Sequence, residues 1–293
     1  MENLEWIILL VLCAAAGWLA YYLNRRNRHD CQVLRQEGLH ISQIIKQLFV
    51  NVQQHRGMMN AFLNGDKSFG VKIEQKESEI ERSLTKLDSL YRPALMPKER
   101  WDNICSTWQS LLKEAHSLAA EDSFRRHSEL IRAIIYLMGD VAERSQITGT
   151  HPADAALASA LWHKLPMAAE GLGQARALGA GAAAKGHCTS VIRIRLRFLE
   201  ERIRETMEWV NDDLKRADPV QAATMTKLWE TTHKSVSDFL ALLEKEIIKT
   251  EKLSVDAGHY FGSATQTIDA LFSVYDQVSS AMERNLPHQD ASS

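Results

Sequence analysis

The sequence predicts an all-α protein built from long helices that pack as elongated up-down bundles. Only 14 Gly and 6 Pro occur in 293 residues, which leaves few turn-forming residues for a many-stranded sheet. Apolar residues recur at helical spacing along most of the chain, and eight such segments can be distinguished. Helices of about 30 residues span about 45 Å, so the molecule should be elongated. Eight helices correspond to one or two four-helix bundles.

The first helix of the body carries an apolar stripe from Leu39 to Val52, which Met59, Phe62 and Leu63 extend. Asn64-Gly65-Asp66 is a typical stop at a helix carboxyl end. No break precedes this helix, so it can continue directly from the apolar segment at the amino terminus.

Seven further helices are predicted, and proline marks the limits of several. Pro166 should kink the fifth, and Asp218-Pro219 is a favourable start for the seventh. Val191–Leu199 alternates apolar and basic residues, so a strand is the alternative there, but the strongly helical continuation favours a helix. Thr148–Pro152 is the clearest internal break. The helices predicted before it are 68–91, from 97 and 122–146, and those after it are 153–185, from 189, 218–252 and 262–284.

The amino terminus is interpreted as a transmembrane anchor. Trp6–Leu23 contains no charge and is long enough to cross a bilayer as a slightly short helix. A cleaved signal peptide is the alternative, but Glu2 and Glu5 make the preceding segment acidic rather than basic. Positive residues stay cytoplasmic, so the basic flank predicts a single-pass protein of the inner membrane with a cytoplasmic body. This flank contains Arg25, Arg26 and Arg28.

Composition argues against several classes of function. The net charge is −2 and no basic stripe is interleaved with aromatic residues, so no nucleic-acid partner is expected. The four cysteines are scattered without zinc-ligand spacing, and Glu114-Ala115-His116 does not fit a di-iron motif, so no metal is expected. Phosphate-binding loops, HExxH and nucleophile elbows are lacking in the sequence, which indicates a protein without a cofactor that is not an enzyme.

Two arginines occur in unusual surroundings. Arg56 lies in Gln53–Leu63 and Arg176 lies in Glu170–Gly181, and small and apolar residues surround each of them. A guanidinium is always charged and offers five donors, so it suits a packed core only where an anion meets it. The pair therefore suggests a buried pocket for a small planar anion. In the alternative, both side chains reach the surface and the nearby glycines merely permit tight packing.

Further residues are candidates for the lining of this pocket. Gln53 and Asn60 flank Arg56 at i−3 and i+4 and could act as secondary donors. Gly57, Gly173 and Gly179 would allow close helix approach, each at a cost of about 1 kcal/mol in helix propensity. His55 points about 100° away from Arg56 on a helix, which predicts a surface or interface position. Arg132 is expected at an exposed edge, with a third anion contact as the alternative.

Three segments resemble the nitrate- and nitrite-sensing domain family. They are Gln53–Met58, Leu165-Pro166 followed by Gly173–Gly181, and Tyr260–Leu271. His55 departs from the family pattern, in which an acidic residue is common. The resemblance covers about residues 35 to 285. It implies two stacked four-helix bundles in a homodimer, with nitrate or nitrite bound by Arg56 and Arg176.

The predicted organisation has three parts: residues 1–28 as the anchor, 29–285 as the sensing-like helical domain, and 286–293 as a disordered tail. Relatives usually carry an attached output module, and none is expected here, so a separate downstream protein partner is predicted. The resulting hypothesis is a membrane-anchored sensor of nitrate or nitrite. The alternative is a ligand-free helical scaffold that recruits partner proteins to the inner membrane.

Overall fold

The computed structural model describes the backbone of residues 2–147, 152–216 and 219–284, and the side chains of 13–147, 155–216 and 225–283. Within these ranges the chain forms helices and no strand, and its one isolated bridge joins His187 to Lys252. The all-α class is therefore confirmed. The predicted tail, 286–293, and most of the predicted break at Thr148–Pro152 lie outside the described residues.

The helices correspond closely to the predicted segments. Their bounds are α1 (Glu2–Leu63), α2 (Gly70–Ser89), α3 (Lys98–Glu114), α4 (Ala120–Arg144), α5 (Pro152–Ser159), α6 (Leu165–Lys185), α7 (Ser190–Arg216), α8 (Pro219–Leu243) and α9 (Ala257–Arg284). A π-helical turn at Ala160–Lys164 joins α5 to α6, so these two form the single helix predicted over 153–185. This departure from α geometry immediately precedes Pro166, which lies in the first turn of α6.

The predicted stop at Asn64-Gly65-Asp66 acts as expected, and a second glycine ends α6 in the same way. Gly65 follows α1 with a φ of 115°, and Gly186 follows α6 with a φ of 69°. Both angles fall in the region that favours glycine, and each glycine ends its helix. Residues 191–199, for which a strand was the alternative, belong to α7.

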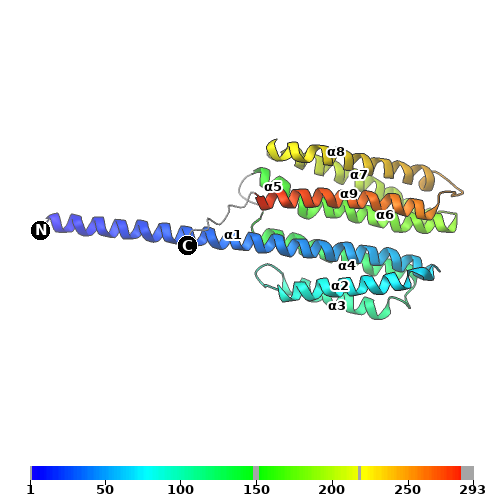
Figure 1. Cartoon of the computed structure of the whole chain (residues 1–293), viewed down its shortest axis with the longest axis horizontal. Helices are drawn as coiled ribbons and strands as arrows, with labels where there is room; N and C mark the ends of the chain where they lie inside the picture. Colours follow the sequence, from blue (N-terminus) through cyan, green and yellow to red (C-terminus); the bar gives the residue numbers. More distant parts are fainter. Residues whose placement is uncertain (1, 148–151, 217–218, 285–293) are drawn as a thin grey trace.

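The helices form two groups that lie side by side along their length (Figure 1). One group contains α1 to α4 and the other contains α6 to α9, with α1 and α4 facing α6 and α9. A single cluster of buried apolar side chains runs through both groups, from Phe49 of α1 through Leu172 of α6 to Tyr275 of α9. The interface between the groups is therefore part of the core, and α1 has packed neighbours on several sides.

The predicted membrane anchor is corrected by the structure. Among the residues described with side chains, no helix is long and apolar enough to cross a membrane. The side chains of residues 6–12, which were part of the predicted span, lie outside the described residues. The predicted inner-membrane localisation is thus contradicted, and the predicted transmembrane helix is not found among the described residues.

The amino-terminal part of α1 extends well beyond the two groups of helices (Figure 1). Its described residues 13–30 are exposed, and Trp18 stacks on Tyr22 with ring centroids 5.7 Å apart. From Gly38 onward α1 enters the body, where Leu39 and Ile41 are buried. Helix α1 continues without interruption past residue 28, where the predicted anchor and body were separated.

Candidate functional site

Arg56 lies inside the molecule on the side of α1 that faces α4 and α6. Its side chain is 1% exposed, and it forms a two-pronged ion pair with Glu170 of α6. Nη1 donates to Oε1 at 2.5 Å and Nη2 donates to Oε2 at 3.1 Å. Nη1 also donates to Ser128 Oγ of α4 at 2.9 Å, and the ring of Phe124 lies 5.2 Å from the guanidinium carbon. Arg56 therefore connects α1 to both neighbouring helices.

Glu170 receives two further hydrogen bonds from glutamine side chains. Gln53 Nε2 donates to Oε2 at 2.9 Å, and Gln174 Nε2 donates to Oε1 at 2.7 Å. Gln53 also donates to the carbonyl of Ala169 at 3.0 Å. The predicted pocket residue Gln53 thus acts as a donor beside Arg56, but its acceptors belong to α6.

Arg176 is also buried, with 3% exposure, but it has no carboxylate partner among the described residues. Nη1 donates to Thr265 Oγ1 of α9 at 3.0 Å, and the guanidinium carbon lies 4.8 Å from the ring centre of Phe261. Burial, reinforced by the nearby charge of Arg56, lowers the pKa of Arg176 to about 10, and the group stays charged at neutral pH. Nothing described here neutralises this charge by direct contact.

The two arginines cross between α1 and α6 in opposite directions, each ending near a glycine of the other helix. A Cβ atom on Gly173 of α6 would lie 3.0 Å from Nη2 of Arg56, and a Cβ on Gly57 of α1 would lie 4.0 Å from Nη2 of Arg176. Because glycine has no Cβ, both helices leave room for the opposite guanidinium. The structure thus places Arg56 beside Gly173 and Arg176 beside Gly57, on the facing sides of α1 and α6.

A methyl group at Gly173 should disturb this arrangement. Its Cβ would lie only 2.6 Å from Nε2 of Gln53 as well as 3.0 Å from Nη2 of Arg56, so both donors must move. We expect Gly173→Ala to lower the free energy of unfolding by about 1–3 kcal/mol, which urea denaturation can measure. Gly181→Ala is the matched control on the same helix, because its Cβ would meet Asn60 at an ordinary 3.7 Å. Equal stability of the two variants would contradict this account.

The other two predicted lining residues serve the packing of α6. Asn60 Nδ2 donates to the carbonyl of Ala177 at 3.4 Å, so its amide faces the α6 backbone. Gly179 accommodates Tyr260, whose hydroxyl would lie 2.3 Å from a Cβ at that position and donates to the carbonyl of Ala175 at 3.0 Å. Neither residue makes a recorded contact with Arg56 or Arg176.

His55 was predicted to lie at the surface or at an interface, and the surface position is wrong. Its side chain is fully buried, with Nδ1 2.7 Å from Nε2 of His127 on α4 and Nε2 3.3 Å from Glu77 of α2. His55 does point to a different side of α1 from Arg56, but α2, α3 and α4 cover that side too. Helical geometry correctly predicted that the His55 side chain points away from Arg56. Its burial depends on neighbouring helices, which the periodicity of α1 does not identify.

Glu170, Ser128, Phe261 and Thr265 contact the two arginines and were not predicted as site residues. A signal for three of them was present. Glu170 begins the segment that contains Arg176, and Phe261 and Thr265 lie in the third segment of the family resemblance. Ser128 lies in an ordinary helix of the sequence and offered no comparable signal.

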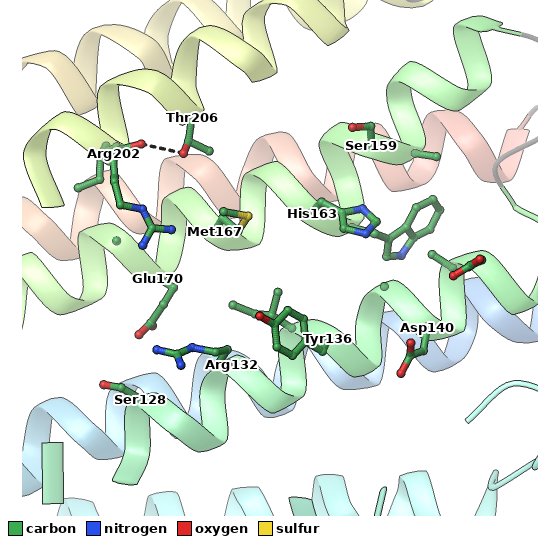
Figure 2. Close-up of a pocket in the computed structure, with 18 of the residues that line it drawn as sticks. Ser128, Arg132, Tyr136, Asp140, Ser159, His163, Met167, Glu170, Arg202 and Thr206 are labelled. Atoms are coloured by element: carbon green, nitrogen blue, oxygen red, sulfur yellow. Dashed lines mark hydrogen bonds between the residues drawn. The ribbon is translucent and has the colours of Figure 1, made fainter. Parts of the chain in front are cut away.

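A cavity of about 690 Å³ lies beside this site, between α4, α6 and α7 (Figure 2). Glu170 and Ser128 form part of its wall, whereas Arg56 and Arg176 are not among its lining residues. Arg132, expected at an exposed edge, is exposed and lines this cavity. In the described part of the chain, no three His, Cys, Asp or Glu side chains are grouped as metal ligands.

The fold and site define a helical bundle that holds buried charged side chains between facing helices, an arrangement from which proteins can build ligand sites. A family model described as nitrate and nitrite sensing matches residues 47–283. The match covers most of the chain, which therefore belongs to the nitrate- and nitrite-sensing family. The resemblance seen in the sequence is confirmed.

The fold is also similar to a solved structure, described as the structure of the NasR transcription antiterminator. The TM-score is 0.72 at 20% sequence identity, and the likeness covers 94% of this chain and 76% of that one. At this identity the comparison shows the shared fold. No curated protein matches the sequence.

Proposed function

We propose that the protein binds nitrate or nitrite between α1 and α6 at the guanidinium groups of Arg56 and Arg176, and that it signals occupancy to a separate protein. The observation that carries this proposal is the local balance of charge. Of the two buried guanidinium groups, only that of Arg56 contacts a carboxylate, that of Glu170, so the positive charge of Arg176 is left without a contacting partner in the described residues. Asp269 of α9 attracts Arg176 electrostatically but is exposed and makes no ion pair with it in the described residues. A monovalent anion would supply the missing charge.

Unused hydrogen-bond donors support the same interpretation. Nε of Arg56 and Nε of Arg176 are both buried, and neither has a partner in the described part of the molecule. Buried donors normally have acceptors, because an unpaired one costs roughly 1–3 kcal/mol. Nitrate is planar and singly charged. Two of its oxygens can accept hydrogen bonds from one arginine when the nitrate and the guanidinium lie in the same plane. Low dielectric surroundings strengthen such contacts.

Calorimetric titration of the protein with sodium nitrate and sodium nitrite, with sodium chloride as a salt control, tests this proposal. We expect saturable one-to-one binding that weakens at least roughly tenfold in Arg176→Met, because a charge-assisted hydrogen bond contributes about 1.5–3 kcal/mol. Arg197→Met is the matched control, since Arg197 is an exposed arginine of α7. Absence of binding to the unaltered protein, or equal affinity of Arg176→Met, would rule the proposal out.

A ligand-free scaffold is the second candidate, and one observation favours it. Glu170 already fills the fork of Arg56, so in a scaffold this pair would simply hold α6 to α1. The same titration decides between the two candidates, because a scaffold gives no saturable heat with either anion. The homodimer and the downstream partner remain predictions from the family resemblance. The lack of a nucleic-acid partner remains a prediction from composition.

A further inference from the structure

The cavity between α4, α6 and α7 and the buried arginine site share a wall. Glu170 and Ser128 line the cavity, and these same two side chains accept hydrogen bonds from Arg56. The side chain of Glu170 is 11% exposed, whereas that of Arg56 is 1% exposed. Glu170 therefore lies between the cavity and Arg56, where it covers the guanidinium.

Two further cations line the cavity near Glu170. Arg132 comes from α4 and Arg202 from α7, and Figure 2 shows both in the part of the cavity that contains Glu170. Both side chains are exposed, and neither forms an ion pair with any residue that the structure describes. The cavity thus offers positive charge to an arriving anion and also to a carboxylate that leaves Arg56.

We infer that this cavity is the access route of the anion and that Glu170 is a built-in competitor, which must release Arg56 before nitrate can bind there and then pairs with Arg132 and Arg202. This inference rests on the proposed function and adds its regulation. A carboxylate is planar and presents two oxygens to the arginine fork, much as one edge of a nitrate does. The two cannot occupy the fork of Arg56 together.

The exchange would link ligand binding to helix packing. With Glu170 on Arg56, α6 is tied to α1, and with Glu170 in the cavity, α6 is tied to α4 and α7 through Arg132 and Arg202. A ligand shifts an equilibrium only through its different affinity for the two states, and nitrate binds the second state alone. The apparent Kd then equals the intrinsic Kd divided by the fraction of molecules in which Glu170 has released Arg56.

Glu170→Gln tests the competition. The neutral amide loses the charge and one acceptor, so it holds Arg56 less tightly, and we expect the nitrate Kd to fall about tenfold or more. Glu143→Gln is the matched control, because Glu143 is an exposed carboxylate of the same cavity without an ion pair in the described residues. It should leave the nitrate Kd within about twofold, as the surrounding charge is screened by solvent. Nitrate affinity that is unchanged or weaker in Glu170→Gln would overturn the inference.

Arg132→Met tests where the released carboxylate goes, and it changes only an exposed side chain. In the unaltered protein it should weaken nitrate binding several-fold, because the released state loses a partner for Glu170. In the Glu170→Gln background the same change should have almost no effect. Equal weakening in both backgrounds would show simple long-range attraction and would overturn the inference, as would an unchanged affinity of Arg132→Met alone.

These outcomes are separable from failure of the proposed function. Loss of nitrate binding in Arg176→Met together with an unchanged Kd in Glu170→Gln would keep the anion site and reject the competitor. Circular dichroism before titration verifies that Glu170→Gln is folded. If that variant is unfolded, an unchanged nitrate affinity of Arg132→Met in the unaltered protein would still overturn the inference.

Discussion

Replacing Arg56 with alanine is expected to lower the free energy of unfolding by about 3 kcal/mol, because it leaves the carboxylate of Glu170 largely buried without its ion pair. Gln53 and Gln174 would still donate to Glu170, but amides do not neutralise a charge. The loss of the Ser128 contact and of the packing of Arg56 against Phe124 adds to the effect. Urea denaturation monitored by circular dichroism measures it.

The double variant Arg56→Met, Glu170→Met is the appropriate control for this prediction. Buried ion pairs can often be replaced by apolar residues of similar volume with little loss of stability, so the double variant should be more stable than Arg56→Ala. An Arg56→Ala protein as stable as the unaltered one would contradict the ion pair described here. Because Arg56→Ala is expected to destabilise the fold, Arg176→Met is the better probe of ligand binding.

The second large effect concerns pH and His127 of α4. His127 is fully buried, and burial, reinforced by the neighbouring His55, lowers its pKa well below the ordinary value near 6.5. Its Nδ1 lies 2.6 Å from the carbonyl of Ser123 and donates to it, so Nε2 accepts from His55 Nδ1 at 2.7 Å. Protonation of His127 would remove that acceptor. Arg56 and Arg126 also lie close enough to disfavour a positive charge on His127.

The sign of the effect follows from linkage. Below about pH 6.5 the unfolded chain binds a proton at His127 that the folded protein does not bind, so stability falls as pH falls. The slope from this residue is about 1.4 kcal/mol per pH unit until the lower, folded-state pKa is reached. Above pH 6.5 the contribution is constant. Urea denaturation at a series of pH values from 7.5 down to 5 measures it.

His127→Asn is the variant that isolates this contribution, since asparagine can keep the donor to the Ser123 carbonyl but does not titrate. Its stability should depend less steeply on pH below about 6.5 than that of the unaltered protein. His116→Asn is the matched control, because His116 is half exposed and lies 3.9 Å from Glu77. A pH dependence that is identical in His127→Asn and the unaltered protein would show that His127 is not the group responsible.

The helices could be predicted because each one buries a stripe of residues that repeats at helical spacing. Helix-ending signals such as Asn64-Gly65-Asp66 act locally, so the end of α1 could be placed from a few residues. Segment 191–199 was ambiguous because nine residues are too few to distinguish the two periods, and the residues after Leu199 resolved it in favour of α7.

The site was only partly accessible from sequence. Arg56 and Arg176 stood out because a charged residue among apolar and small ones is chemically unusual, and both are buried. The ion pair between Arg56 and Glu170 was missed because it depends on how α1 and α6 are rotated relative to each other. The burial of His55 was missed for a related reason, since α1 is enclosed on more sides than one apolar stripe indicates.

The most direct test of the central claim is a crystal structure of the protein grown with saturating nitrate. We expect a planar anion between α1 and α6 within hydrogen-bond distance of the guanidinium groups of Arg56 and Arg176, and contacts to Nε atoms that otherwise lack partners. Nitrate bound elsewhere, with Glu170 still paired to Arg56 and no anion at Arg176, would contradict the account.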